Sequence, residues 1–303
     1  MITTLHRSTT RSRRTIQFDG ILPASAVIVV GLCQAEWPVW CRMWGLAFTV
    51  FFTCKLLTWR RALAAGAPRR LARSINYLVA WPGMDAETFL SNRRPANLPT
   101  VGEWIQAAGK TALGCALFVF AATQLAHDAP TAAAWLAMVG LVLFLHCGTF
   151  HLAALVWQSD GIVAEPIMNR PFYAGSLADF WGRRWNRAFR ELADAYVYRP
   201  LTKSVGPQVA FATVFLASGL VHELVITLPA GAGYGRPTLY FLLQAAGVFV
   251  SRSAIGRRLQ LSRGVGARCL AALVIVAPLG LLCPQPFLMN VIIPFLHAID
   301  NCL

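Results

Sequence analysis

Apolar residues along this chain gather in long runs that are separated by shorter, basic stretches. A helix needs roughly 20 apolar residues to cross a bilayer, and several of the runs reach or approach that length. Because backbone polar groups find no water inside a bilayer, spans of this kind form helices. The pattern predicts an all-α, polytopic membrane protein with about eight transmembrane helices and further amphipathic helices at the interface. The expected spans are residues 21–36, 38–58, 102–126, 132–157, 205–228, 237–251, 268–283 and 287–300.

Composition supports a membrane protein over a soluble one. The 303 residues are 56% hydrophobic and only 13% charged, whereas soluble domains carry about 25% charged residues. We expect a single membrane domain over residues 20–303, preceded by a basic tail over residues 1–19. The tail and the apolar stretch that follows it mimic a signal peptide, but the many later spans favour a retained first helix.

Basic residues predict the orientation of the spans. The tail and the loops 59–100, 158–203 and 252–268 hold 23 of the 27 lysines and arginines, and with eight spans all four lie on one side. By the positive-inside rule that side, with the N-terminus, is predicted to be cytoplasmic. Because the net charge of +14 sits between apolar runs, anionic membrane lipids are expected partners and nucleic acid is not.

One basic segment after the fourth span has an amphipathic pattern. Its arginines fall largely on one arc and its apolar side chains on the other, which predicts a helix lying in the membrane interface. Asn186 lies at the edge of the apolar arc, where an amide must find a partner or serve one. The apolar positions are Trp181, Trp185, Phe189, Leu192 and Tyr196.

His222 lies within a run, residues 205–228, that is otherwise almost free of charge. Ionisable residues at membrane depth are costly, and by default they indicate a functional site. The alternative is a hydrogen bond to a neighbouring span, which contributes only about 0.6 kcal/mol on average. Glu223 follows directly and points about 100° away around the helix, where it could pair with an arginine or orient a neighbour.

These segments resemble a known family. The stretches SLADFWGRRWN (176–186), VYRPL (197–201) and SGLVHE (218–223) are similar to the membrane-bound O-acyltransferase family, and within it to the wax synthase branch. YLVAWPGMDAETFL (77–90) and AEPIMNRP (164–171) also resemble that branch. The resemblance covers a core of about residues 77–250, and FWGRRWN together with the HE pair is its most specific part.

The resemblance implies transfer of a fatty acyl group inside a buried catalytic chamber. The donor would be an acyl-CoA thioester, acting as a co-substrate with no permanently bound cofactor. The acceptor would be a lipophilic hydroxyl, most simply a long-chain alcohol that yields a wax ester. His222 would be catalytic and Asn186 would assist it. We expect substrate contacts, including guanidinium contacts to coenzyme A phosphates, from Trp181, Arg183, Arg184, Trp185, Arg187 and Glu223.

Several alternatives stay open at this point. A sterol, a sugar or a natural-product hydroxyl could be the acceptor, and acyl-carrier protein could replace coenzyme A. A small-molecule transporter would need acidic pairs in the spans or inverted repeats, and a non-catalytic lipid-binding scaffold is a third class. No metal site is expected, because the histidines are dispersed and the cysteines form no CxxC pair. His146 and His151 could line a tunnel or simply pack in the bundle.

Overall fold

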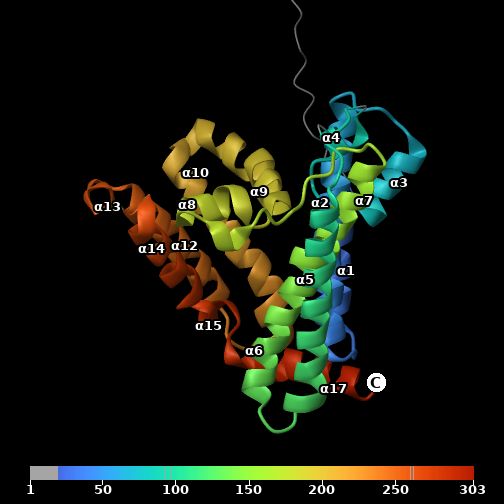
Figure 1. The fold of residues 1–303 in the computed structure, drawn as a ribbon, viewed down its shortest axis with the longest axis vertical. Helices are drawn as coiled ribbons and strands as arrows, with labels where there is room; N and C mark the ends of the chain where they lie inside the picture. Colours follow the sequence, from blue (N-terminus) through green and yellow to red (C-terminus); the bar gives the residue numbers. More distant parts are fainter. Residues whose placement is uncertain (1–19, 92, 96, 260, 262) are drawn as a thin grey trace, which may run out of the picture.

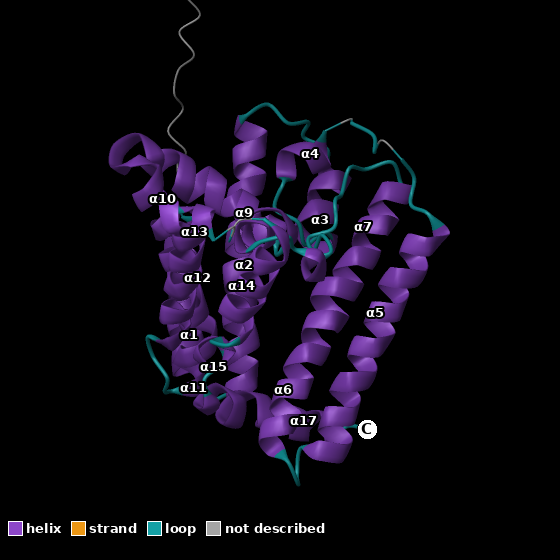
Figure 2. Ribbon diagram, turned by 60° about the vertical axis from the view of Figure 1, so that its left-hand side comes forward, coloured by secondary structure: helices purple, strands orange, loops and turns teal. Residues whose placement is uncertain are grey.

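The computed structural model describes residues 20–91, 93–95, 97–259, 261 and 263–303. Every regular element in this part of the chain is helical (Figure 2), which confirms the predicted all-α class. The expected basic tail, residues 1–19, lies outside the described residues.

The first half of the chain forms long helices and two short ones. Helix α1 packs along α2, and the helices after residue 100 form an antiparallel hairpin. The elements are α1 (Ile21–Gln34), α2 (Val39–Ala64), α3 (Leu71–Ala80), α4 (Ala86–Leu90), α5 (Val101–Phe120), the π-helical η1 (Ala121–Leu125), α6 (Pro130–Leu141), the π-helical η2 (Val142–Thr149) and α7 (Phe150–Ser159).

The second half begins with short helices and continues with longer ones. In Figure 1 the short helices α3, α4, α8 and α9 lie at one end of the molecule, and the turn between α5 and α6 lies at the other end with the C-terminus. The elements are η3 (Pro171–Tyr173), α8 (Leu177–Asp179), η4 (Phe180–Arg184), α9 (Arg187–Ala193), η5 (Asp194–Tyr198), α10 (Arg199–His222), η6 (Glu223–Thr227), α11 (Leu228–Ala230), α12 (Arg236–Arg252), α13 (Ala254–Arg258), α14 (Gly264–Val276), α15 (Leu279–Leu282), α16 (Gln285–Phe287), η7 (Leu288–Ile292) and α17 (Ile293–Asp300).

Among the residues that the structure describes, four helical stretches are long and apolar enough to cross a membrane, so the protein is an integral membrane protein. They coincide, to within one residue at the C-terminal end, with or contain the predicted third, fourth, fifth and seventh spans. Helix α1 is apolar but has only 14 residues, and α2 is long but carries several basic residues. The count of eight spans therefore stays a prediction. The four stretches are Val101–Leu125, Pro130–Ser159, Arg187–Ala230 and Gly264–Leu282.

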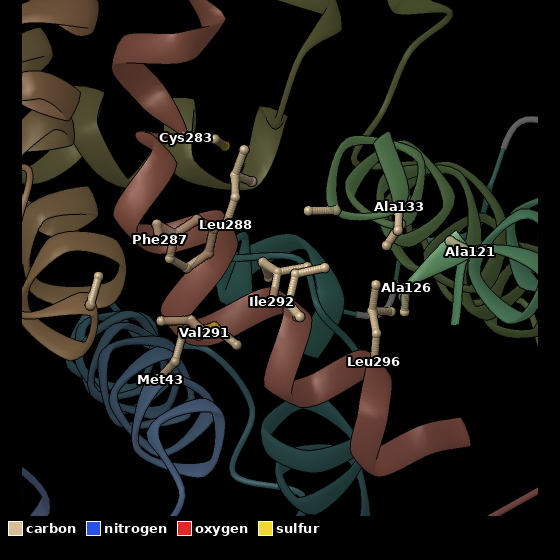
Figure 3. Close-up of a cluster of buried hydrophobic side chains, with 14 of the residues drawn as sticks. Met43, Ala121, Ala126, Ala133, Cys283, Phe287, Leu288, Val291, Ile292 and Leu296 are labelled. Carbon is tan, nitrogen blue, oxygen red and sulfur yellow. The ribbon is translucent and has the colours of Figure 1, made fainter. Parts of the chain in front are cut away.

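The predicted eighth span, residues 287–300, differs from its expected course. Residues of η7 and α17 run across the lower ends of α2 and α6 instead of alongside them (Figure 1). Figure 3 shows the reason, because large side chains of this segment lie against alanines of η1 and α6, whose small size lets helices approach closely. This core includes Met43, Ala121, Ala126, Ala133, Leu288, Val291, Ile292 and Leu296.

A buried lysine fastens the segment after α3 to α2. Lys55 is fully buried, and its Nζ donates to the Gly83 carbonyl at 2.7 Å while lying 3.2 Å from the centroid of the Tyr77 ring. The Tyr77 hydroxyl bonds in turn to the Thr58 hydroxyl at 2.7 Å. Lys55 was not predicted to be important, although a lone lysine inside an apolar run is a usable signal.

Candidate active site

Two of the motifs that carry the resemblance are joined by backbone hydrogen bonds. The N–H of Asn169 donates to the carbonyl of Arg184 at 2.8 Å, and the N–H of Arg187 donates to the carbonyl of Ile167 at 3.0 Å. The Arg187 guanidinium also pairs with Glu165. AEPIMNRP and FWGRRWN therefore form one folded unit, which we call the signature unit.

The helix expected over residues 181–196 is broken near its start. The π-helical turn η4 ends at Arg184, Trp185 is extended (φ −92°, ψ 130°), and Asn186 has a left-handed backbone (φ +39°). Asparagine tolerates that region better than most residues. Its Oδ1 accepts the N–H of Phe189 at 3.1 Å and so caps α9. The expected place of Asn186 within one continuous helix is therefore wrong.

Capping fixes the orientation of the Asn186 amide. With Oδ1 engaged, the amide nitrogen keeps two N–H donors that no described residue accepts. An asparagine before a helical run is a capping signal in sequence, and the regular spacing of apolar residues concealed it. The neighbouring Trp185 ring stacks on Phe180, with 5.3 Å between centroids. No hydrogen bond among the described residues joins Asn186 to His222, so their cooperation stays a prediction.

Trp181 links the signature unit to the long helices. Its ring lies 5.8 Å from that of Phe215 on α10 and 5.7 Å from that of Phe241 on α12, measured between centroids. Its Nε1 donates to Oε1 of Gln244 at 3.2 Å, and Gln244 is fully buried. Since a buried amide needs partners, this bond also fixes where the indole lies.

His222 ends α10 at the point where the helix widens into the π-helical turn η6. Its ring lies 4.5 Å from the Phe241 ring, and Nδ1 lies 2.7 Å from the carbonyl oxygen of Ser218. Because a carbonyl oxygen only accepts hydrogen bonds, Nδ1 carries the proton and Nε2 the lone pair. The side chain is half-buried, and Nε2 has no partner among the described residues. Single π-helical turns occur frequently at functional sites.

The Glu223 carboxylate fastens the start of α12 to α10. Its Oε1 accepts the N–H and the hydroxyl of Thr238 at 3.0 and 2.9 Å, and its Oε2 accepts the hydroxyl of Thr227 at 2.5 Å. Gly219 lies so close to Thr238 that an added Cβ would come within 2.6 Å of the Thr238 Cα. These contacts set the face of α12 on which His222 packs. The structure thus gives Glu223 a supporting role, and its substrate contact stays a prediction.

Each of the three arginines expected to contact substrate already has a carboxylate partner. Arg183 and Arg184 pair with Asp179 at 2.9 and 2.5 Å, and Arg187 pairs with Glu165. Burial alone would raise the pKa of Asp179, but a backbone N–H and the two guanidinium groups outweigh it and hold that pKa below its usual value. These arginines stabilise the signature unit itself, and their contact with substrate stays a prediction.

Helix α2 holds η5, the helical turn that follows the signature unit and α9. Arg61 donates to the carbonyl of Ala195 at 3.0 Å, and its guanidinium carbon lies 5.1 Å from the centroid of the Tyr196 ring. The Tyr196 hydroxyl donates to the carbonyl of Leu57 at 2.9 Å. The site is therefore assembled from α2 as well as from α10 and α12.

The other histidines of the long helices lie in a different region. His146 packs its ring 5.4 Å from Phe150, and its Nδ1 is buried without a partner. It belongs to η2, whose main contacts are with α5, α6 and α7. Within the described residues, no group of three or more histidine, cysteine, aspartate or glutamate side chains is arranged to hold a metal ion.

Comparison with known proteins points to the same segment. Residues 164–244 match the model of the family described as membrane bound O-acyl transferase. The chain is 32% identical over 144 residues to probable long-chain-alcohol O-fatty-acyltransferase 9 of Arabidopsis thaliana, a stretch that covers 43% of this chain and 42% of that protein. It is 28% identical over 169 residues to the long-chain-alcohol O-fatty-acyltransferase of Simmondsia chinensis, covering 48% and 47%.

A third relative acts on a different acceptor by its name. The acyl-CoA–sterol O-acyltransferase 1 of Arabidopsis thaliana is 41% identical over 81 residues, which cover 24% of this chain and 23% of that protein. The chain thus spans less than half the length of each of these relatives. The family-model match nevertheless contains the whole FWGRRWN motif, Asn186, His222 and Glu223, so the segment that carries the candidate site is similar to the membrane bound O-acyl transferase family and to its long-chain-alcohol O-fatty-acyltransferases.

Proposed function

We propose that the protein is a membrane-embedded O-acyltransferase that moves a fatty acyl group from acyl-CoA to the hydroxyl of a long-chain alcohol, forming a wax ester. One observation carries this proposal: the Ser218 carbonyl holds the proton on Nδ1 of His222, which leaves the Nε2 lone pair without a partner among the described residues. A neutral imidazole of this kind is a general base. The long-chain-alcohol relatives support the choice of acceptor.

The proposed reaction is a direct transfer between the two substrates. Nε2 of His222 takes the proton of the alcohol as its oxygen attacks the thioester carbonyl carbon. The carbon–sulfur bond then breaks, and the leaving thiolate receives that proton, so the products are an ester and free coenzyme A. Such proton transfer typically contributes 10²–10⁴-fold to the rate. No covalent acyl-enzyme is needed.

Asn186 is proposed as the assisting residue. The Asn186 Oδ1 accepts the N–H of Phe189, so the side-chain N–H groups of Asn186 stay available as donors. Donors fixed in advance stabilise the negative charge that develops on a carbonyl oxygen during acyl transfer. They could equally hold the alcohol oxygen in place. Either role needs substrate to lie between Asn186 and His222.

The sterol relative favours a second acceptor class. Because the acyl-CoA–sterol O-acyltransferase is 41% identical to this chain over 81 residues, a sterol is the acceptor to compare with the fatty alcohol. We further propose that the N-terminus and the donor entrance face the cytoplasm, where the basic loops are predicted to lie, with anionic lipids around them.

Purified protein in neutral-lipid nanodiscs tests the function. Labelled palmitoyl-CoA is supplied with hexadecanol or with a sterol, and the products are separated by chromatography. We expect labelled wax ester from wild type and none above background from His222→Ala. Preferential formation of sterol ester would show that the acceptor is a sterol and not a long-chain alcohol. Movement of either substrate across sealed vesicles without any ester would favour a transporter and overturn the proposal.

A further inference from the structure

A basic cavity lies outside the site described above. It has a volume of about 560 Å³ and opens between the start of α3, the end of α7 and the stretch before α5. This volume falls in the range of small-molecule sites, roughly 300–1,000 Å³. Its polar lining consists of Arg70, Arg73, Arg94, Ser159 and Asp160.

Two of the three arginines in this cavity are uncommitted. The side chains of Arg70 and Arg94 are exposed and make no hydrogen bond or ion pair with any residue that the structure describes. The Arg73 guanidinium already has one hydrogen-bond partner, because it donates to the carbonyl of Ser91. The arginines of the signature unit, in contrast, are already paired with Asp179 and Glu165. Free guanidinium groups, which suit phosphate, are therefore found here.

The start of α3 adds a second group of donors. Arg70 is the residue before this ten-residue helix, and no side chain caps the helix. The first N–H groups of a helix have no partner within it, and together with the helix dipole they favour an anion. A phosphate at this point would meet backbone N–H groups as well as guanidinium groups.

A neighbouring cavity leads from this point toward the signature unit. It has a volume of about 410 Å³, shares Pro95 and Leu98 with the basic cavity, and reaches Glu165. Glu165 is the partner of Arg187 in the signature unit. Figure 1 places α3 at the same end of the molecule as α8 and α9. A long ligand could therefore extend from one region to the other.

We infer that the basic cavity binds the phosphate-bearing nucleotide of the thioester donor, an inference that rests on the proposed function. A phosphate monoester carries a charge of roughly −1.5 to −2 at neutral pH and would lie between Arg70, Arg94 and the start of α3. Asp160 repels phosphate but accepts hydrogen bonds, as carboxylates do from ribose hydroxyls in nucleotide sites. A ligand that carries a phosphate beside a ribose hydroxyl therefore fits the residues that line this cavity.

Direct binding tests the cavity without any reaction. Adenosine 3′,5′-bisphosphate, the nucleotide end of coenzyme A, is titrated into the protein in neutral-lipid nanodiscs by calorimetry. The double variant Arg70→Gln/Arg94→Gln should weaken binding about tenfold or more, because two charge-assisted contacts are lost. Arg69→Gln, at an exposed neighbour outside the cavity, is the matched control. Equal affinity of wild type and double variant would overturn the inference.

Nanodiscs with phosphatidylglycerol separate a nucleotide from a lipid headgroup. For a nucleotide site, the bisphosphate affinity falls at most modestly when the anionic lipid is present. If the lipid abolishes binding of the bisphosphate, and the double variant loses only lipid binding, the cavity is a headgroup site and the inference is wrong. Arg73 is left unchanged in these variants because it also holds the Ser91 carbonyl.

A donor without a nucleotide separates this inference from the proposed function. With acyl-CoA, the double variant should raise KM about tenfold, whereas with an acyl N-acetylcysteamine thioester it should equal wild type. If the double variant is active and its KM for both donors equals that of wild type, the nucleotide site is wrong and the proposed function still stands. Normal bisphosphate binding by a protein that forms no ester from any donor contradicts the proposed function alone.

Discussion

Lys55 and His222 are both ionisable residues within apolar helices, and the structure treats them differently. Lys55 is fully enclosed, and its Nζ lies between the Gly83 carbonyl and the Tyr77 ring. His222 is half-buried, and only one of its two ring nitrogens is bonded to a residue that the structure describes. The contacts of Lys55 hold the segment after α3 against α2. His222, in contrast, keeps a lone pair on Nε2 that no described residue uses.

The difference shows that burial alone does not mark a reactive group. A buried polar group with its partners supplied is a structural contact, and its loss mainly affects stability. A group that keeps hydrogen-bonding capacity and stays accessible can act on a substrate. The comparison therefore predicts that variants of the two clusters change different measured quantities.

The largest expected effect is on the rate, at His222. His222→Gln keeps a polar side chain of similar size but removes the base, so the rate of ester formation should fall at least about 10²-fold. The thermal unfolding temperature, measured by intrinsic fluorescence, should stay close to wild type because only the Ser218 bond is altered. A variant with near wild-type turnover would place His222 in the same class as Lys55.

The second effect concerns the free donors of Asn186. Asn186→Asp preserves a good helix cap and tolerates the left-handed backbone, but it lacks the amide N–H groups. We expect stability near wild type with a rate lower by about 10²-fold, as for loss of an oxyanion donor. Asn186→Gly, which suits the backbone without donors, should match that loss. Full activity in both variants would show that Asn186 only caps α9 and takes no part in the reaction.

The third effect is on stability, at Lys55. Lys55→Met leaves the Gly83 carbonyl without a donor, which should lower the free energy of unfolding by about 1–3 kcal/mol. The rate per folded molecule should change little. Lys203→Met, at an exposed position, is the control and should not alter the unfolding temperature. A variant that unfolds like wild type but loses turnover would assign Lys55 to the reaction.

The smallest effect is expected at Glu223, which borders His222 but has all its partners. Glu223→Gln can still accept from Thr238 and can donate to Thr227, so it should cost about 0.5–1 kcal/mol of stability and lower kcat less than tenfold. The KM values for donor and acceptor should not move. A large rise in either KM would instead support the predicted contact between Glu223 and substrate.

Sequence alone predicted the all-α membrane fold, and it singled out residues of the candidate site. The charge-free run around His222 predicted that this residue lies inside an apolar helix, and the basic loops predicted one end of the molecule. Periodicity did not reveal the break at Trp185 and Asn186, because two non-helical residues leave the spacing of apolar residues along the sequence unchanged. The course of η7 and α17 depends on alanines far away in sequence, and the pairing of Arg187 with Glu165 depends on how two loops meet.

The bond between His222 and the Ser218 carbonyl has a geometric consequence. Since that bond commits one nitrogen to the main chain, a single edge of the imidazole must serve both the alcohol oxygen and the sulfur. In the proposed reaction the two substrates therefore converge on that edge, and their hydrocarbon tails must diverge from it along separate paths. By microscopic reversibility, the same nitrogen would handle the proton when an ester is cleaved by a thiol.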